Sequence, residues 1–497
     1  MSAAGEELST LAPLDMAAVR IDPGWALRIP VSLARRKKVL PCCQIDGRVL
    51  VACVDRTDVA TLDTVERYLE HAIEPVVAEE TSLEAVIRNT FGGAATQNGM
   101  VRVAAGRGVG DEDAVQICEE ILQAAALKEA SDIHIDPLSE HVRVRLRVDG
   151  QLENYRDFAS ELHPQISSRI KILAEMDISE RRSPQDGRFS WTSSRDESID
   201  VRVATLPTRL GESLTLRLLA GNMENLTLSR LGMDAEDLEI FSTAIGRPHG
   251  LILLTGPTGS GKSTTLYAAI RELISTTSLH VVTVEDPVEY EMNGITQVAV
   301  DSADKVSFSK ALRSILRNDP DVIMIGEIRD PETADVAIKA ALTGHLVFST
   351  LHTNTAAGAV TRLIDMGVQP FLVAATLRLA VAQRLVRRLC LHCRQKTLLT
   401  VSHAAALGMP DARDTTAWQS GSCIYCAGRG KTGRTALFEM LPVGEEMAHL
   451  ISKGTEEVPL RTLAKNEGCR TLTEDALRKI EQGMVTASDA QGAVAVW

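Results

Sequence analysis

Near the middle of the chain stands Gly256-Pro257-Thr258-Gly259-Ser260-Gly261-Lys262-Ser263, which matches the pattern G-x-x-x-x-G-K-[ST]. Its glycines let backbone N–H groups wrap a phosphate chain, Lys262 would reach the β- and γ-phosphates, and the Ser263 hydroxyl would ligate Mg²⁺. The apolar run 250–255 before it reads as a strand, and the residues from Ser263 to Ile274 read as a helix. This order of strand, loop and helix predicts nucleotide binding by the loop together with Thr264.

Further short apolar runs follow at 280–284, 322–325 and 346–349, with helical patterns between them. Continuous apolar strands separated by helices indicate a parallel sheet covered on both faces. Residues 231–497 are therefore predicted to form one α/β domain. Such a sheet presents its ligands at the carboxyl ends of the strands.

Two acidic motifs stand at predicted strand ends of this domain. Glu285 opens Glu285-Asp286-Pro287-Val288-Glu289, and Glu327 follows Ile325-Gly326. Glycine stands where an aspartate usually holds Mg²⁺, so we expect Glu327 to position and polarise the attacking water. Glu285 is a second catalytic candidate. The alternative for both carboxylates is that they cap helices.

Histidines and arginines of the same domain are further candidates. His345 and His352 stand at either end of the predicted strand 346–349, and would either sense the γ-phosphate, couple subunits or serve the structure. Arg313 and Arg317 lie four residues apart on a predicted helix. They would neutralise phosphate charge, as an arginine finger does, or belong to a solvated face.

The chain before residue 231 has a different pattern. Residues 1–91 are predicted to form a small α/β domain, 92–110 a Gly/Ala-rich flexible linker, and 111–230 an α+β domain. Arg202 and Arg217 stand on predicted strands of this middle domain.

Four cysteines form two C-x-x-C pairs, Cys390 with Cys393 and Cys423 with Cys426. Four thiolates complete a tetrahedral Zn²⁺ site with no open position, so the predicted metal is structural rather than catalytic. The insertion at about 388–432 is longer than a compact ribbon and is predicted to hold secondary structure of its own. Because it has little apolar sequence, we expect the metal to stabilise it. Buried thiols without metal and a redox pair are the alternatives.

Composition limits the choice of partners. The chain has 497 residues, a net charge of −13 and only 3% aromatic residues, which argues against general binding of nucleic acid. Residues 1–15 have no basic region before an apolar core, and Arg378, Gln383 and Arg384 interrupt the most apolar stretch. The sequence predicts a cytosolic protein that reaches a membrane only through a partner.

Together these motifs resemble the secretion ATPases of type II secretion and type IV pilus systems, most closely the GspE-type ATPases of type II secretion. The resemblance covers about residues 111–482. Besides the motifs above, it is carried by Ala130–Ile135, Arg145–Gly150, Pro184–Arg188, Gly326–Asp330, Gly344–Asn354, Ala382–Cys390 and Gly433–Ala436.

The resemblance implies a RecA-like P-loop ATPase domain that hydrolyses ATP within a homohexamer on the cytoplasmic face of the inner membrane. The N-terminal domain would dock on a membrane-anchored GspL-like protein, and a polytopic GspF-like protein would receive the work of assembling a pseudopilus. Arginines of the middle domain, matched here by Arg202 and Arg217, would reach the nucleotide, with Arg313 and Arg317 on the ATPase side. Pilus-assembly ATPases share these features in broad form and are the alternative.

Two other classes of protein fit the sequence less well than an ATP-driven motor does. A nucleic-acid translocase is disfavoured by the charge and by the scarcity of aromatic residues. A scaffold that binds ATP only to hold its shape is disfavoured by the intact Lys262, Ser263 and Glu327.

Overall fold

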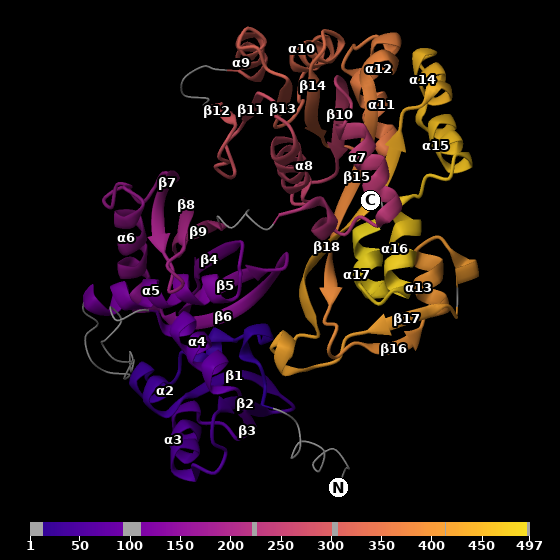
Figure 1. Ribbon diagram of the computed structural model, residues 1–497. Helices are drawn as coiled ribbons and strands as arrows, with labels where there is room; N and C mark the ends of the chain where they lie inside the picture. The colour runs from indigo at the N-terminus through magenta and orange to yellow at the C-terminus, as the bar shows by residue number, and fades with distance from the viewer. Residues whose placement is uncertain (1–12, 93–110, 221–225, 301–306, 413, 495–497) are drawn as a thin grey trace. The chain divides into compact units, whose positions relative to one another are not determined.

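The computed structural model describes residues 13–92, 111–220, 226–300, 307–412 and 414–494 (Figure 1). The chain forms two compact units. The first holds residues 1–221 with 390–393 and 420–432, and the second holds 222–389, 394–419 and 433–497. Except for Gly92, the predicted linker at 92–110 lies outside the described residues, as do residues 1–12.

The first unit begins with a small α/β domain. In its sheet β2 pairs antiparallel with β1 and parallel with β3, and the core is sealed by the buried side chains of Leu83, Ile87 and Phe91. Its elements are η2 (Met16–Ala18), α1 (Pro23–Ala26), α2 (Val31–Lys37), β1 (Val39–Ile45), β2 (Arg48–Cys53), α3 (Val59–Leu69), β3 (Ile73–Val77) and α4 (Glu80–Phe91).

The middle domain completes the first unit with an antiparallel sheet in the order β6-β5-β4-β9-β8-β7. Strand alternation buries valine and leucine on one face and leaves arginine on the other, as in β5. Its elements are α5 (Asp111–Leu127), β4 (Asp132–Pro137), β5 (His141–Val148), β6 (Gln151–Ala159), η3 (Ser160–Leu162), α6 (His163–Leu173), β7 (Gln185–Thr192), β8 (Ser198–Thr208) and β9 (Gly211–Ala220).

The second unit is built on a sheet in the order β12-β11-β13-β14-β10-β15-β18. The pairings from β12 to β15 are all parallel, which confirms the predicted parallel sheet. Its strands are β10 (Gly250–Thr255), β11 (Val281–Glu285), β12 (Thr296–Ala299), β13 (Val322–Ile325), β14 (Leu346–Leu351), β15 (Leu377–Leu389) and β18 (Lys431–Pro442).

Helices cover both faces of this sheet, so the side chains of its central strands are buried on both faces. Leu251 and Leu253 of β10 belong to a core formed with α9 to α12 and α14 to α17, whereas Ile252 and Leu254 pack with α7 and α8. These helices are α7 (Ala235–Ile245), α8 (Lys262–Thr276), α9 (Phe308–Ile315), α10 (Pro331–Leu342), α11 (Ala356–Asp365), α12 (Pro370–Thr376), α14 (Glu445–Ser452), α15 (Glu457–Asn466), α16 (Leu472–Glu481) and α17 (Ala487–Val494), with η4 (Leu228–Leu231) before them.

The insertion between the cysteine pairs holds secondary structure, as predicted: β16 (Gln395–Leu398), α13 (Val401–Ala406), η5 (Pro410–Ala412) and β17 (Thr416–Gln419), followed by η6 (Ile424–Cys426). The expectation that it lacks apolar packing is wrong. Leu399, Ala404, Leu407 and Ala417 are buried and join the large core of the second unit. Residues 394–419 are therefore packed into the hydrophobic core of the second unit, and their stabilisation by the metal stays a prediction.

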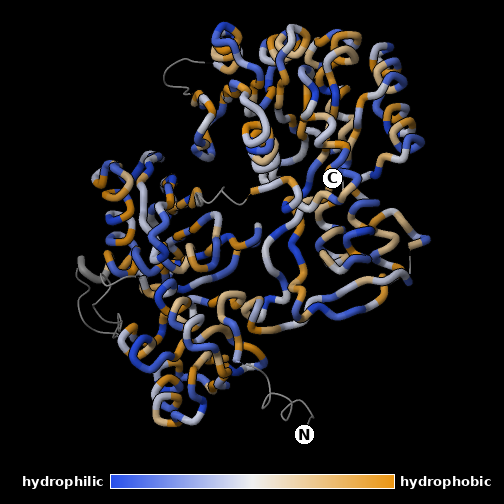
Figure 2. The backbone as a smooth tube through the Cα atoms, viewed as in Figure 1, coloured by the Kyte–Doolittle hydropathy of each residue, from blue (hydrophilic) through white to orange (hydrophobic). Residues whose placement is uncertain are grey.

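Hydrophobic and hydrophilic residues are interspersed along the described parts of the chain (Figure 2). Among the helices that the structure describes, none is long and apolar enough to cross a membrane.

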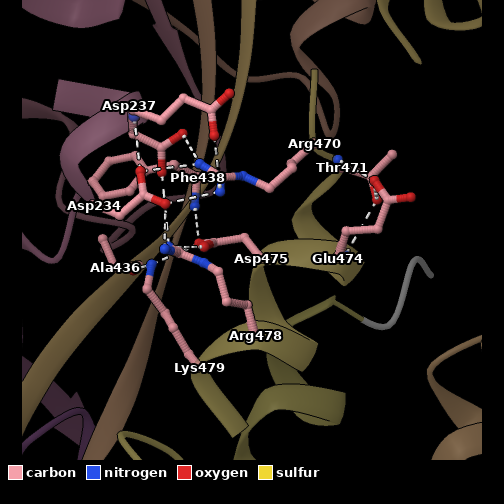
Figure 3. Close-up of polar contacts among 11 residues, drawn as sticks. Asp234, Asp237, Ala436, Phe438, Arg470, Thr471, Glu474, Asp475, Arg478 and Lys479 are labelled. Carbon is pink, nitrogen blue, oxygen red and sulfur yellow. Dashed lines mark hydrogen bonds and ion pairs between the residues drawn. The ribbon is translucent and has the colours of Figure 1, made fainter. Parts of the chain in front are cut away.

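A cluster of ion pairs ties the start of α7 to α16 (Figure 3). Asp234 caps α7 and, with Asp237, accepts the guanidinium of Arg470 at 2.8 Å from each carboxylate. Asp475, fully buried, accepts Arg478 at 2.7 Å and Lys479 at 2.6 Å. Burial alone would raise the pKa of Asp234, but the hydrogen bonds and charges around it, chiefly from Arg470, lower that pKa to about 2.

We expect Arg470→Ala to lower the free energy of unfolding by about 3 kcal/mol, because the buried Asp237 carboxylate would keep only the more distant Arg478, 3.9 Å away. The control is Lys465→Ala, since this exposed lysine only approaches Glu474 at 3.9 Å; it should cost about 0.5 kcal/mol or less. Urea denaturation of both variants and the wild type gives the comparison. Equal unfolding midpoints for the two variants would show that the cluster does not stabilise the fold.

Candidate nucleotide-binding site

The predicted phosphate loop joins the carboxyl end of β10, at Thr255, to the first residue of α8, Lys262. Gly256 and Gly261 have φ values of +148° and +87°, which side-chain-bearing residues rarely adopt. A Cβ atom at Gly256 would lie 2.5 Å from the carbonyl oxygen of Gln383, and one at Gly261 would lie 2.8 Å from its Nε2. The loop therefore needs glycine at both positions to pack closely against β15.

Lys262 closes the loop on itself. Its Nζ donates hydrogen bonds to the carbonyl oxygens of Gly256 at 2.8 Å and Pro257 at 3.1 Å. Within the described residues, the buried Ser260 hydroxyl has no hydrogen-bond partner, whereas Ser263 is exposed in the first turn of α8. A helix N-terminus, an ammonium group and two hydroxyls fit a phosphate chain with its Mg²⁺.

Burial lowers the pKa of Lys262 to about 8, and the charge of Glu327 offsets part of that effect. A phosphate beside the ammonium would raise this pKa again, so nucleotide binding should take up a fraction of a proton above about pH 8. The affinity for MgADP should therefore fall as the pH rises through 8.

Calorimetric titration at about pH 8.5, in buffers of different ionisation enthalpy, measures this uptake directly. A MgADP affinity that stayed constant from about pH 7 to 9, with no proton taken up, would contradict the assignment of Lys262 to the phosphates.

Glu327 lies at the same edge of the sheet as the loop. Hydrogen bonds from Gly326 N–H to Val284 O (2.8 Å) and from Thr350 Oγ1 to Gly326 O (2.7 Å) fix the end of β13 between its neighbours. The carboxylate of Glu327 accepts a hydrogen bond from Arg329 and lies 3.2 Å from Nε2 of His352. Burial would raise the pKa of Glu327, but these two partners, Arg329 foremost, keep it below its ordinary value. Glu327 is therefore ionised and oriented at neutral pH.

Glu285 is the last residue of β11, at the same edge of the sheet as Glu327, but its side chain is buried. Its buried carboxylate accepts hydrogen bonds from Tyr267 Oη, from Thr283 Oγ1 at 2.7 Å and from Gln297 Nε2 at 3.3 Å. These neutral donors hold the residue in place, so its geometry favours a role in supporting the site. Its catalytic role remains a prediction.

The two histidines are not brought together. His352 follows β14 at the carboxyl edge, against Glu327, whereas His345 precedes β14 and lies near the carbonyl oxygen of Ala340 at 2.9 Å. At a strand rise of about 3.3 Å per residue, roughly 23 Å separate them. The position of His352 fits sensing of the γ-phosphate. His345 lies at the amino end of β14, at the opposite edge of the sheet. For His345, coupling between subunits is the functional alternative that remains.

Arg313 and Arg317 are exposed in the second unit. Arg313 pairs with Glu332 at 2.7 Å, and Arg317 donates to the carbonyl oxygen of Arg313 at 3.0 Å. Helix α9 ends at Ile315, so Arg317 lies beyond it. The prediction that Arg317 lies on the same helix as Arg313 is wrong. Neither Glu332 nor the carbonyl group of Arg313 belongs to the phosphate loop.

Arg202 and Arg217 belong to the first unit, and their contact with the nucleotide stays a prediction. They face each other across the antiparallel pair β8–β9. Arg217 donates from Nε to Asp132 at 3.0 Å, while its side chain stays 61% exposed. Their opposite positions give the arginine-bearing face of this sheet two adjacent guanidinium groups.

The four predicted metal ligands come together. Their Sγ atoms lie within 4.8 Å of one another, with Cys390 to Cys423 at 3.7 Å and Cys393 to Cys426 at 3.8 Å. Four thiolates at the usual Zn–S length of about 2.3 Å in a tetrahedron have sulfur spacings of about 3.8 Å. Gly430 N–H donates to the sulfur of Cys426 at 3.1 Å. The geometry therefore fits a closed four-thiolate zinc site.

Several residues around the site were not identified from the sequence. Arg329 orients Glu327, Tyr267 and Gln297 hold Glu285, and Gln383 contacts the phosphate loop. Arg329 and Gln383 stood inside motifs that carried the family resemblance, and that was the available signal. Tyr267 and Gln297 had none, because only the fold brings them to Glu285.

A phosphate loop at the end of a central parallel strand, with Glu327 and His352 at the same edge, defines a P-loop ATPase of RecA-like fold. The family model described as Type II/IV secretion system protein matches residues 109–492, and the model of the MshEN domain matches residues 10–97. The chain therefore belongs to the family of type II/IV secretion system proteins. The MshEN match gives a family to the N-terminal region.

Relatives of both system types are similar over most of their length. Type II secretion system protein E of Pseudomonas aeruginosa is 37% identical over 96% of this chain and 98% of its own. The type II secretion system protein HxcR of the same organism is 46% identical over 76% of each chain. The type IV pilus assembly ATPase PilB of Myxococcus xanthus is 38% identical over 95% of this chain and 87% of its own.

Solved structures support the fold. The pilus retraction motor PilT, determined with bound ADP, has a TM-score of 0.51 and 27% identity over 75% of this chain and 95% of its own. The ATPase DotB of Legionella pneumophila has a TM-score of 0.57 at 24% identity, over 76% of this chain and 94% of its own, which is a likeness of fold.

Proposed function

We propose that this protein hydrolyses ATP to power pseudopilus assembly and protein export by a type II secretion system. The observation that carries the proposal is the convergence at one edge of the sheet of Lys262 and Glu327, whose carboxylate lies 3.2 Å from Nε2 of His352. Near full-length similarity to type II secretion system protein E supports the physiological part.

In this proposal Lys262 and the N-terminus of α8 hold the phosphates, and the hydroxyl of Ser263 holds Mg²⁺, which supplies charge neutralisation. Glu327 accepts a hydrogen bond from the attacking water and orients it toward the γ-phosphorus, while His352 and Arg329 hold the carboxylate. Arg202 and Arg217 of the middle domain, and the exposed Arg313 and Arg317, would add positive charge as the transition state forms.

Arg202 and Arg217 belong to the first unit, whereas the phosphate loop belongs to the second. In this proposal turnover therefore depends on assembly of the subunits. We propose a homohexamer that stays in the cytoplasm and lies peripheral to the inner membrane through its partners. Residues 1–91 would dock on a GspL-like membrane-anchored protein, and a GspF-like protein would receive the work. An isolated subunit should then hydrolyse ATP slowly, because its set of charges is incomplete.

Assembly of a type IV pilus is the second candidate, because PilB of Myxococcus xanthus aligns over 95% of this chain. Capture of the tagged full chain from detergent-solubilised membranes of the source cells separates the two. Recovery of a GspL-like protein supports secretion, whereas recovery of pilus-assembly membrane proteins alone would transfer the function to the pilus.

Zinc is the proposed structural metal. The knuckle from 422 to 430 packs Ile424, Tyr425 and Ala427 against the core of the N-terminal domain within the first unit. A Cβ atom at Gly428 would come within 2.9 Å of the carbonyl oxygen of Gln44. Metal binding would thus order a surface that contacts the N-terminal domain.

We expect one zinc ion per chain, lost in Cys423→Ser and retained in the control Cys469→Ser, whose half-buried thiol lies outside the cluster. Removing the metal should increase hydrogen exchange at 420–432 and in β1, while 394–419 stays protected by its apolar contacts. Metal analysis with hydrogen-exchange mass spectrometry tests both parts. Protein purified without chelators that contained no metal would contradict the site.

A further inference from the structure

Gln383 follows the part of β15 that pairs with β10, and its side chain contacts the phosphate loop. β15 runs parallel to β10 with Thr255 opposite Ala382, so Gln383 stands level with the first residue of the loop. Its side chain is 1% exposed. Nε2 donates to the carbonyl oxygen of Ser260 at 2.9 Å, and Oε1 accepts from Thr265 Oγ1 at 2.9 Å.

These two hydrogen bonds need an amide. A carbonyl oxygen accepts only, so it requires a donor from residue 383, and the carboxamide then offers its own oxygen to the Thr265 hydroxyl. Glutamate lacks the donor, and methionine of similar shape lacks both groups. The amide therefore joins the second half of the loop to the first turn of α8 through buried contacts.

Lys262 makes further side-chain hydrogen bonds to the loop, and nucleotide binding would remove them. Lys262 holds the carbonyl oxygens of Gly256 and Pro257, but it can serve a phosphate only by leaving them. The bond from Gln383 to Ser260 uses no group that the phosphates need. It can persist while Lys262 turns to its ligand.

We propose that Gln383 is a positioning residue that fixes the phosphate loop, so that its backbone N–H groups meet the phosphates in one arrangement. The inference rests on the proposed function in that the ligand is a nucleoside di- or triphosphate. Arg384 extends the same support, since it donates to Gln383 O at 3.0 Å and to Asn354 O, in the loop after His352, at 3.0 Å.

The test measures MgADP binding to the full chain with a fluorescent ADP. Gln383→Met should weaken the affinity about tenfold, or ~1.4 kcal/mol, because the loop must then be ordered by the ligand itself. The fraction of active sites should stay unchanged. Thr265→Val removes the other half of the bridge, together with a longer bond of 3.3 Å to Gly261 O, and should also weaken binding. Thr265→Ser keeps the hydroxyl and should bind as the wild type does.

The double variant Gln383→Met with Thr265→Val should cost less than the sum of the single changes, because both remove one bridge. Thr376→Val is the matched control. It deletes a buried hydrogen bond to the carbonyl oxygen of Leu372, just before β15 begins, and should leave the MgADP affinity unchanged.

The outcomes separate two failures. Wild-type protein that bound no MgADP would overturn the proposed function. Wild-type binding with equal affinity in Gln383→Met would overturn the positioning role alone, as would weaker binding in Thr376→Val to the same extent. If Gln383→Met does not fold, Thr265→Val against Thr265→Ser still decides.

Discussion

Glu327→Gln should keep nucleotide affinity within about twofold of the wild type and lower steady-state phosphate release about 10³-fold. The carboxylate is held by Arg329 and His352 at the edge of the sheet where the phosphate loop begins. Glutamine keeps its shape but loses the charge that polarises water, so binding and chemistry separate.

Both quantities come from fluorescent-nucleotide titration and phosphate release on the same preparation. Glu445→Gln, which removes an exposed carboxylate from α14, is the control and should behave as the wild type. Normal turnover in Glu327→Gln would move the water-positioning role to Glu285 or remove it from both residues.

Arg217→Ala should lower kcat by about 10²-fold or more while the affinity for ATP changes little. The side chain is largely exposed and uses Nε for its contact with Asp132, so its charge is presented outward from the sheet. A cation that meets the γ-phosphoryl group as charge develops stabilises the transition state more than the bound substrate.

The control for this change is Arg209→Ala, an exposed arginine in the turn between β8 and β9. It removes the same charge from the same domain and should leave kcat unchanged. Unaltered kcat and affinity in Arg217→Ala would leave Arg217 as a partner of Asp132 only.

The sequence predicts the elements of the ATPase domain well, because its signals are local. Apolar runs such as Val322–Ile325 lie between turn and helix patterns, and the glycines of the phosphate loop determine its backbone. The order of the strands has no local signal. β15 lies beside β10 although more than a hundred residues separate them, and only the fold shows that contact.

The same limit applies to the site. The sequence marks Glu285 and Glu327 alike, as acids after strands, but the structure encloses Glu285 among three donors and pairs Glu327 with the charged Arg329. It marks His345 and His352 as a pair, although a whole strand separates them. The motifs predict which types of residue the site contains. The direction and order of the strands decide which of these residues lie at the same edge of the sheet.

If ATP turnover at this site drives type II export, a strain lacking the protein should export type II substrates only when an active copy is supplied. The experiment measures this export in the strain complemented with the wild type or with Lys262→Ala, while pilus assembly is scored in the same cells. We predict that the wild type restores export, that Lys262→Ala at equal abundance does not, and that pili are unaffected. Export restored by Lys262→Ala, or pili restored in place of export, would contradict the account.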